Sequence, residues 1–338
     1  MKTKSKKIIC IIKNFLIFYT LLHSSMTYAY FELIPLGVYG GTDTSNLTSF
    51  LLKSSKHNKY ICLDAGTVAA GIDKALKQGS INIGGRKNRI GFVFRNLIDS
   101  YWISHGHLDH VAGLIALSPE DTNKNIYGIN STITYLRDYY FNWVSWPNMT
   151  NEGLHPLDKY NLISVDILSK FNIGETGLKG VAYPLDHGIN PVTGIAYPSS
   201  ALKISEGDDE IVFFGDTGPD AEQKSKKLND IWVSLADDVK QKKLKAIAIE
   251  VSYNNNRQAK NLMGHLNPKA LYSELSKLEK YSGGKGALKG LKVFIIHVKP
   301  TNDLTGLEAS NKIMKELRRY NDLGVVFIRP KQGKLYKI

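Results

Sequence analysis

The chain has 338 residues, of which 43% are hydrophobic and 22% charged, and this composition indicates a globular protein and excludes a disordered one. Its formal net charge of +13 favours anionic substrates or surfaces, but the basic residues are spread along the chain and do not by themselves indicate nucleic-acid binding. No repeat of fixed period and no low-complexity segment is visible, which argues against a repeat architecture.

The first 29 residues have the pattern of a secretory signal peptide. Lysines crowd the start, an apolar stretch runs from Ile8 to Leu22, and small residues precede a cleavage position after Ala29. A membrane anchor is the alternative, but a spanning helix needs about 20 mostly apolar residues. This stretch is shorter and contains Lys13 and Asn14. We therefore expect an exported chain, periplasmic or secreted, with no membrane anchor after cleavage.

Cleavage changes the charge and the cysteine content of the chain. The leader contains five lysines and no acidic residue, so the formal net charge falls by five, from +13 to +8. Cys62 is then the one remaining cysteine, and an exported protein with a single cysteine has no internal disulfide framework. We expect the core, with help from bound metal, to stabilise the fold.

Beyond the leader, short apolar runs separated by glycines predict strands, and apolar residues at helical spacing predict helices. The expected strands are 31–41, 49–55, 59–67, 100–104, 201–206, 210–218, 244–252 and 291–300. The expected helices are 68–79, 110–118, 220–243 and 267–281. Strands and helices alternate in both halves, which predicts an α/β protein with sheets covered by helices. We expect one domain, from residue 30 to residue 338.

A dense cluster of metal-ligand residue types follows the strand expected at 100–104. His105, His107, Asp109 and His110 lie within six positions, and they include three of the nine histidines. Imidazole nitrogen and carboxylate oxygen are ligands of zinc. Residues two apart on an extended segment point the same way, so His105 and His107 can reach one ion. Asp109 and His110 lie where the chain turns into a helix and would face a second ion.

Three further strand ends offer ligands, namely His187, Asp216 and His297. Each follows an apolar run and precedes a turn signal, and a carboxylate such as Asp216 can bridge two cations. Taken alone, a histidine after a strand more often has a structural role, because buried polar groups need partners whatever their function, and Asp216 alone could cap its turn. The density of the first cluster is what predicts a metal site.

The segment SHGHLDHVAGL resembles the HxHxDH signature of the metallo-β-lactamase superfamily, and HGHLDHVAGLIALSP is similar to the narrower signature of class II cyclic-nucleotide phosphodiesterases. Further blocks resemble that family in the same order, namely YFNWVSWPN, YPSSALKIS with FFGDTGPD, IAIEVSYNNNRQAKNLMGHLNP and FIIHVKP. The matches run from about Gly37 to Pro300. HxHxDH alone specifies only the superfamily, whereas the series of blocks makes the narrower resemblance specific.

The resemblance implies an αββα four-layer sandwich with two divalent metal ions at its edge, zinc being expected first, although His and Asp also accept manganese or iron. It implies one metal held by His105, His107 and His187, another held by Asp109, His110 and His297, and Asp216 between them. Asp186 stands where a serine is expected before His187, which could alter the surroundings of that ligand. Asp64 matches the first superfamily motif and is expected to orient the ligand loop.

The resemblance also implies the reaction, hydrolysis of 3′,5′-cyclic AMP, and cyclic GMP as a further possible substrate, to the 5′-monophosphate. Two metals about 3.5–4 Å apart can share a hydroxide that attacks phosphorus. His265 is the candidate proton donor to the leaving 3′ oxygen, Glu250 would hold it, and Asp109 is counted with them as catalytic. A helix-entry role for His265 and a structural hydrogen bond for Glu250 are the alternatives.

Substrate contacts are expected in the aromatic segment YLRDYYFNWVSWPN, because bases stack on exposed aromatic rings. Its candidate rings are Tyr139, Tyr140, Phe141, Trp143 and Trp146. Trp146, Asn142 and Asn148 are the expected contacts to base or ribose, although an aromatic core on a helix explains most of the rings better than substrate contact does.

Two other classes of function stay open on the sequence. One is another hydrolase of the same fold, such as a tRNase Z-like nuclease, a lactonase or a β-lactamase; no inserted arm for RNA is visible, and neither lactonase nor β-lactamase chemistry calls for the WPN and GHLNP blocks. The other is a metal-stabilised exported binding protein, but seven ligands divided over two ions leave positions open for water. The expected partner is thus a small cyclic nucleotide, not nucleic acid, and the oligomeric state is left open.

Overall fold

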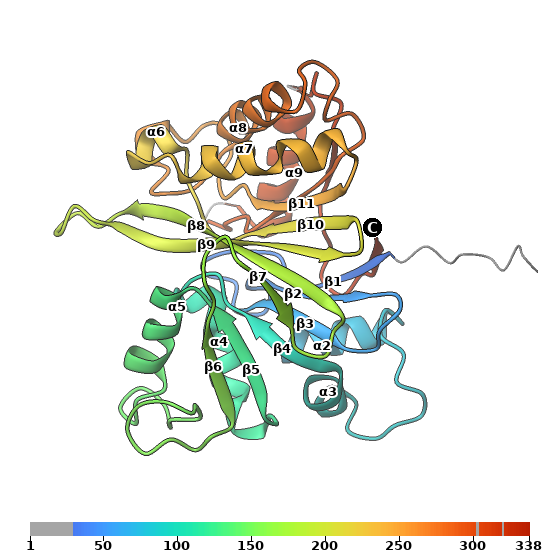
Figure 1. Ribbon diagram of the computed structural model, residues 1–338, viewed down its shortest axis with the longest axis vertical. Helices are drawn as coiled ribbons and strands as arrows, with labels where there is room; N and C mark the ends of the chain where they lie inside the picture. The colour runs from blue at the N-terminus through green and yellow to red at the C-terminus, as the bar shows by residue number, and fades with distance from the viewer. Residues whose placement is uncertain (1–29, 302–303, 320) are drawn as a thin grey trace, which may run out of the picture.

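The computed structural model describes residues 30–301, 304–319 and 321–338, so the expected leader lies outside the described residues. Two seven-stranded sheets lie face to face at the centre of the molecule (Figure 1). The first sheet has the strand order β14-β1-β2-β3-β4-β5-β6. Its strands are β1 (Phe31–Gly37), β2 (Ser49–Ser54), β3 (Tyr60–Ala65), β4 (Ile98–Trp102), β5 (Lys124–Gly128), β6 (Tyr160–Ser164) and β14 (Tyr336–Lys337).

The second sheet has the strand order β13-β12-β11-β10-β9-β8-β7. Its strands are β7 (Lys170–Ile173), β8 (Leu178–Ile189), β9 (Ala196–Glu206), β10 (Asp209–Phe214), β11 (Leu244–Glu250), β12 (Lys292–Ile296) and β13 (Val326–Ile328). The long strands β8 and β9 form an antiparallel hairpin that extends beyond the body of the sheet (Figure 1).

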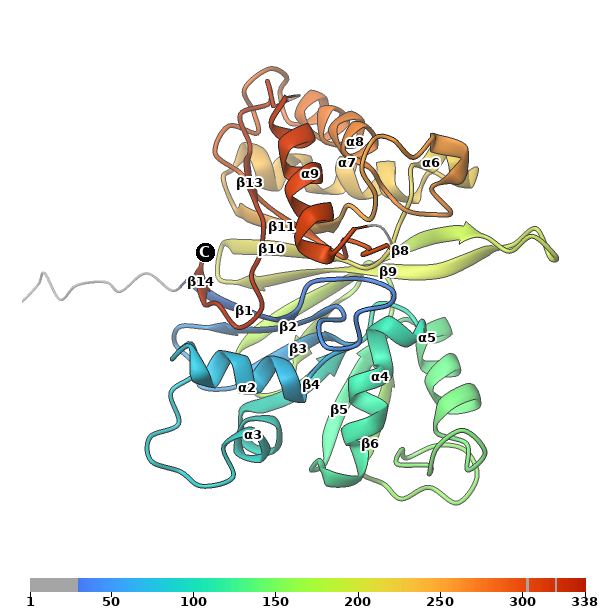
Figure 2. The same cartoon turned by 180° about the vertical axis from the view of Figure 1, so that it is seen from behind.

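Helices cover the outer face of each sheet, as Figures 1 and 2 show from opposite sides. Over the first sheet lie α2 (Ala69–Lys77), α3 (Arg89–Phe92), α4 (Leu108–Leu117) and α5 (Asn130–Tyr135), with the π-helical turns η1 (Val93–Leu97) and η3 (Leu136–Tyr140). Over the second lie α6 (Asp220–Gln223), α7 (Lys227–Lys240), α8 (Pro268–Tyr281) and α9 (Gly306–Arg319), while η2 (Ser118–Glu120) and η4 (Ala259–Asn261) are short 3-10 turns. The expected αββα sandwich in a single domain is confirmed.

The core follows these layers. One cluster of buried side chains fills the space between the sheets, where the ring of Phe50 on β2 meets that of Phe213 on β10 edge-on, with centroids 5.7 Å apart. One further cluster lies between the first sheet and its helices, and another lies between the second sheet and its helices. Helix α7 shows why, since its buried residues recur at the spacing of one helical face, as in Leu228, Ile231 and Leu235. Burying each such side chain stabilises the fold by about 1.5–3 kcal/mol.

The prediction of a single helix over 220–243 is wrong, because the chain forms two helices there, α6 and α7, with a break between them. Lys224 takes a left-handed backbone conformation (φ 52°), which ends α6. The carboxylate of Asp220 then accepts hydrogen bonds from the backbone N–H groups of Leu228 and Asn229, at 3.1 and 2.8 Å, in the first turn of α7. Such a cap satisfies N–H groups that have no partner within the helix.

In the described part of the chain, no helix has the length and apolar character that a bilayer crossing requires. The site-bearing strands meet at one edge of the sandwich. β3 and β4 run parallel in the first sheet, and β10, β11 and β12 run parallel in the second. Their carboxyl ends therefore present the following loops to a common space, which is where open α/β sheets bind ligands.

Candidate metal centre

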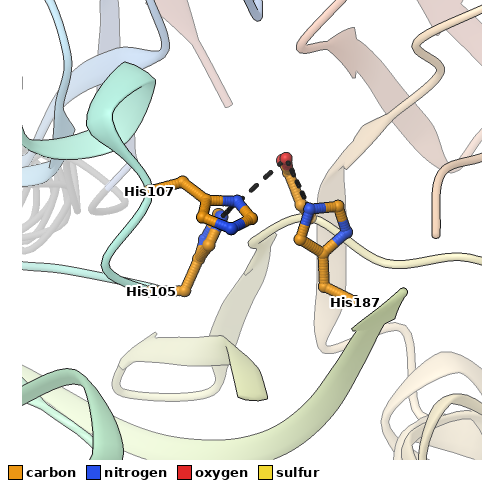
Figure 3. A group of neighbouring side chains, drawn as sticks. His105, His107 and His187 are labelled. Carbon is orange, nitrogen blue, oxygen red and sulfur yellow. Dashed lines mark hydrogen bonds and ion pairs between the residues drawn. The ribbon is translucent and has the colours of Figure 1, made fainter. Parts of the chain in front are cut away.

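The seven predicted ligands come together at this edge, from both halves of the sandwich. His105 and His107 follow β4, and Asp109 and His110 lie in the first turn of α4. His187 is on β8, and Asp216 and His297 follow β10 and β12. Figure 3 shows the imidazoles of His105, His107 and His187 converging around a common point. Residues that are up to 192 positions apart are thus neighbours.

The first cluster contains His105, His107, His187 and Asp216. Their ligand atoms all lie within 4.8 Å of one another. Nε2 of His105 is 3.1 Å from Nδ1 of His107, and Oδ2 of Asp216 is 3.9 Å from Nε2 of His105 and 3.6 Å from Nε2 of His187. Three imidazole nitrogens and one carboxylate oxygen form a donor set that suits zinc and related divalent ions.

The second cluster contains Asp109, His110 and His297. Nε2 of His297 is 3.1 Å from Oδ2 of Asp109. Asp216 reaches this cluster too, since its carboxylate lies 3.3 Å from Nε2 of His110 and 3.1 Å from Nε2 of His297. The buried carboxylate of Asp216 therefore faces both clusters, as a bridging ligand must.

In four of the histidines, Nδ1 is hydrogen-bonded to a partner outside the ligand set and Nε2 points towards the other ligands, which supports a metal-binding role. The pairs are His105 with Ser104 Oγ (3.0 Å), His110 with Asp64 Oδ2 (2.7 Å), His187 with the Gly264 carbonyl (2.8 Å) and His297 with Ser252 Oγ (3.1 Å). Metal-ligating histidines usually donate their other N–H in this way.

One buried atom directly indicates space for a cation. Nε2 of His110 is buried and forms no hydrogen bond of good geometry with the described residues, although Asp216 lies 3.3 Å away. Burying an imidazole nitrogen without a partner costs free energy, and a cation between these two groups would satisfy both. The residues of the site therefore fit a metal ion.

The pKa values of the first cluster favour the form that binds metal. Burial lowers the pKa of His107 to about 4 and that of His187 to about 3, and it lowers that of His105 well below the ordinary value. These imidazoles are neutral at pH 7, with a lone pair to offer. In the second cluster, burial alone would lower the pKa of His110, but the carboxylates of Asp216 and Asp64 outweigh it and raise that pKa.

Asp64 holds the ligand loop, as expected. It is fully buried at the end of β3 and accepts hydrogen bonds from the backbone N–H of Ser104 (2.7 Å) and from Ser104 Oγ (2.9 Å), besides the one from His110. These contacts fix both the loop before His105 and the ring of His110, so Asp64 acts through the ligands.

His297 needs a neighbour without a side chain. It takes a left-handed conformation (φ 54°) directly after β12, which turns its ring towards Gly40. A Cβ at Gly40 would lie 2.3 Å from the imidazole, so only glycine leaves room for this ligand.

Next to the clusters lies the predicted Glu250–His265 pair. Nδ1 of His265 is 2.8 and 3.1 Å from the two carboxylate oxygens of Glu250. The same fully buried carboxylate accepts hydrogen bonds from the backbone N–H of Thr217 (2.9 Å) and from Ser252 Oγ (2.7 Å). Because its oxygens are already engaged, Glu250 suits the orientation of His265 better than ligation of a metal.

Tyr197 is a site residue that the sequence did not single out. Its ring stacks on His107 with centroids 4.2 Å apart, and on its other side it stacks on Tyr135 at 5.3 Å. Tyr197 comes from β9 and Tyr135 from α5, so the contact joins the second sheet to a helix that covers the first. Tyr197 lies within the YPSSALKIS block, and that block was the one available signal for it.

The side chains of the three predicted substrate contacts form hydrogen bonds within the protein. Asn148 is fully buried and its amide donates to the carbonyls of Glu152 and Leu154. The side-chain oxygen of Asn142 accepts from two following backbone N–H groups, and Trp146 Nε1 donates to Ser118 Oγ at 3.0 Å. These hydrogen bonds give each side chain a partner within the protein, and their contact with substrate stays a prediction.

Asp186 is turned away from its neighbour His187. Its carboxylate accepts hydrogen bonds from Ser225 Oγ and from the ammonium of Lys227, both at 2.7 Å. It ties β8 to the segment between α6 and α7. The departure from the expected serine thus affects the packing around this strand, while His187 keeps its bond to Gly264.

Solved structures share this arrangement. The crystal structure of unliganded yeast PDE1 has a TM-score of 0.78 at 23% identity, covering 90% of this chain and 98% of that one. The metallo-β-lactamase fold protein YhfI from Bacillus subtilis has a TM-score of 0.60 at 14% identity, covering 91% and 99%. At these identities the likeness concerns the fold, and it defines the class: the chain has the metallo-β-lactamase fold.

Sequence comparison narrows this class. The family model of the class-II cAMP phosphodiesterases matches residues 31–333. A "Probable 3′,5′-cyclic-nucleotide phosphodiesterase" of Yersinia pestis is 44% identical over 318 residues, covering 92% of this chain and 90% of that protein. A 3′,5′-cyclic-nucleotide phosphodiesterase of Aliivibrio fischeri is 42% identical, covering 90% and 91%. The chain belongs to the class-II cAMP phosphodiesterases, a family of metal-dependent hydrolases, and the expected resemblance is confirmed.

Proposed function

We propose that the protein hydrolyses 3′,5′-cyclic AMP to 5′-AMP with two divalent metal ions. The observation that carries this proposal is the carboxylate of Asp216 between two ligand clusters, with the Glu250–His265 pair beside them. When bound, two such ions supply a nucleophile from water at neutral pH and positive charge against the phosphoryl oxygens.

The ligand residues divide between the two ions. His105, His107 and His187 would hold one ion, and Asp109, His110 and His297 would hold the other, with Asp216 shared. His107 and Asp109 are half-buried, whereas the other five are buried. The half-buried pair therefore marks the side from which a substrate approaches.

His265 is the proposed proton donor. Water adds to phosphorus as the bond from phosphorus to the 3′ oxygen breaks, and that oxygen needs a proton to leave. Glu250 fixes His265 through Nδ1, so Nε2 is the nitrogen that faces the substrate side and delivers the proton. A positioned acid of this kind contributes about 10²–10⁴-fold to the rate.

The proposal is tested by incubating the purified protein with 3′,5′-cyclic AMP, with and without a chelator, and by separating the products chromatographically. We expect release of 5′-AMP that stops on chelation. Asp109→Ala should lower activity at least about 10²-fold, because it removes a ligand, whereas Asp208→Ala on the exposed surface is the matched control. Full activity in Asp109→Ala would contradict the proposal. Cyclic GMP is the substrate to compare next.

Metal analysis tests the two-ion model separately. We expect two ions per chain, with zinc as the first candidate, and fewer in Asp216→Ala. A single tightly held ion in the active wild-type protein would exclude the dinuclear centre.

We propose export on the pattern of residues 1–29. Protein recovered from the periplasm or medium of a bacterial host should begin at Tyr30. An intact leader on active protein that stays inside the cell would contradict export.

A further inference from the structure

We infer that Lys299 is a further catalytic residue, which binds the phosphate of the substrate beside the proton donor. The inference rests on the proposed function. Lys299 lies two residues after His297, in the loop that follows β12. Its Nζ is 2.8 Å from Nε2 of His265, the nitrogen that must face the leaving oxygen.

The chain holds Lys299 in place from two sides. Its backbone N–H donates to the carbonyl of Ser252 at 3.0 Å. Its methylene stem passes within 3.9 Å of the Cβ position at Gly41, whose own N–H donates to Asp109 at 2.8 Å. The ammonium thus lies between the second ligand cluster and His265, and its side chain is half-buried.

No carboxylate among the residues that the structure describes forms an ion pair with the ammonium of Lys299. Within residues 30–301, 304–319 and 321–338, the imidazole of His265 is the one hydrogen-bond partner of Nζ, and no ion pair involves it. An ammonium has three donors and no acceptor, and two donors are left for a ligand.

A role for Lys299 that is limited to positioning the ring of His265 accounts less well for these contacts. Glu250 already fixes the ring of His265 through two oxygens. Moreover, Nε2 of His265 cannot accept a hydrogen bond from Lys299 while it donates its own proton to the leaving oxygen. Substrate must therefore displace this hydrogen bond, and the nearest new acceptor for the ammonium is a phosphoryl oxygen, whose growing charge it would stabilise.

Two substrates with different leaving groups separate these roles. The 3′ oxygen of cyclic AMP needs a proton to leave, whereas the 4-nitrophenolate of bis(4-nitrophenyl) phosphate leaves without one. His265→Ala should therefore slow only the first reaction, by about 10²–10⁴-fold. Lys299→Met should lower kcat/KM for both substrates by a similar factor, about 10²–10³-fold, and Lys299→Arg should restore part of it.

A binding measurement adds a readout that does not depend on turnover. Inhibition by inorganic phosphate should weaken about tenfold or more in Lys299→Met, because a charged hydrogen bond is lost, and should be unchanged in His265→Ala. Lys269→Met, at an exposed position on α8, is the matched control for loss of one positive charge. Unchanged metal content in Lys299→Met and Lys299→Arg shows that the centre is intact.

The outcomes are distinct. If Lys299→Met slows only cyclic AMP hydrolysis, Lys299 acts through His265 and the inference is wrong; it is also wrong if neither reaction changes. If the wild-type protein hydrolyses bis(4-nitrophenyl) phosphate but not cyclic AMP, the proposed substrate fails, while the comparison of Lys299 variants on the aryl ester still decides the role of the ammonium.

Discussion

His107 differs from the other histidines in how its ring is held. Its Nδ1 faces the first cluster, and its other nitrogen forms no hydrogen bond to any residue that the structure describes. Instead, the ring of Tyr197 lies flat against it, 22° from parallel, with Tyr135 behind. Stacking on Tyr197 thus fixes the orientation of the His107 ring, whereas a hydrogen bond at Nδ1 fixes the rings of His105 and His187.

Removing that ring should weaken metal binding. We expect Tyr197→Ala to lower metal affinity about 10–100-fold, the loss typical when a group that orients a ligand is removed, while Tyr197→Phe keeps the ring and most of the affinity. Competition with a chromophoric chelator measures both variants. Equal affinity of Tyr197→Ala and wild type would show that the loop alone holds His107.

Cys62 provides a residue-scale test of burial. Burial raises the pKa of its thiol from 9.0 to about 12, with Ser49 as a hydrogen-bonding neighbour. Because only the thiolate is reactive, the folded protein should resist thiol reagents at pH 8. In a Cys10→Ser variant, labelling should follow unfolding in urea. Rapid stoichiometric labelling without denaturant would contradict the buried position.

The residue scale also shows what sequence patterns can and cannot find. Histidine and aspartate at strand ends were found because their chemistry is specific and parallel strands bring their ends together. Tyr197 and Lys299 were missed because tyrosine and lysine are common surface residues. Their roles come from contacts with His107 and His265 across sheets or loops, which local spacing does not encode.

Among the elements, α8 shows a local signal that leads directly to structure. Asn267 precedes Pro268, and its side-chain oxygen accepts from the backbone N–H of Ala270 at 2.9 Å. Proline at the first helical position loses no bond there. The GHLNP block therefore starts a helix at Pro268, three residues after the proposed proton donor His265.

Asn267→Ala should destabilise the protein by about 1 kcal/mol, because it removes this cap. Urea unfolding followed by far-UV circular dichroism measures the free energy of unfolding. Asn267→Asp keeps an acceptor and should lose much less. Equal losses in both variants would show that the cap oxygen is not what matters at this position.

The break between α6 and α7 shows the opposite case. The stretch 220–243 is rich in helix formers, so propensity predicts one helix. The break depends on the side chain of Asp220 folding back onto Leu228 and Asn229, eight and nine residues later. Tertiary contacts of this kind override local preference.

At the scale of the whole molecule, the metal centre joins the two halves of the sandwich. Four of the predicted ligands follow β4 or lie at the start of α4, in the half that contains the first sheet. The other three, His187, Asp216 and His297, belong to the half that contains the second sheet. The α/β class and the layers of the sandwich could be predicted from the alternation of strands and helices and from the family resemblance. The order of the strands within each sheet could not be predicted, because a pairing such as β14 with β1 joins segments that lie far apart in the sequence.

Metal removal should therefore weaken the fold as a whole. A ligand at 100 times its Kd stabilises the native state by about 2.7 kcal/mol, which corresponds to roughly 4 °C in Tm for a domain of this size. Calorimetry with and without a chelator measures the difference, and restoring metal should reverse it. An unchanged Tm after complete removal of metal would contradict a centre that holds the halves together.

In the proposed reaction, water attacks phosphorus and expels the 3′ oxygen. Hydrolysis of 3′,5′-cyclic AMP in water labelled with oxygen-18, followed by mass spectrometry of the isolated nucleotide, tests this step. We expect 5′-AMP with one labelled oxygen in its phosphate group, and no 5′-AMP after chelation. Release of 3′-AMP, or no turnover by protein with its metal sites filled, would exclude this reaction.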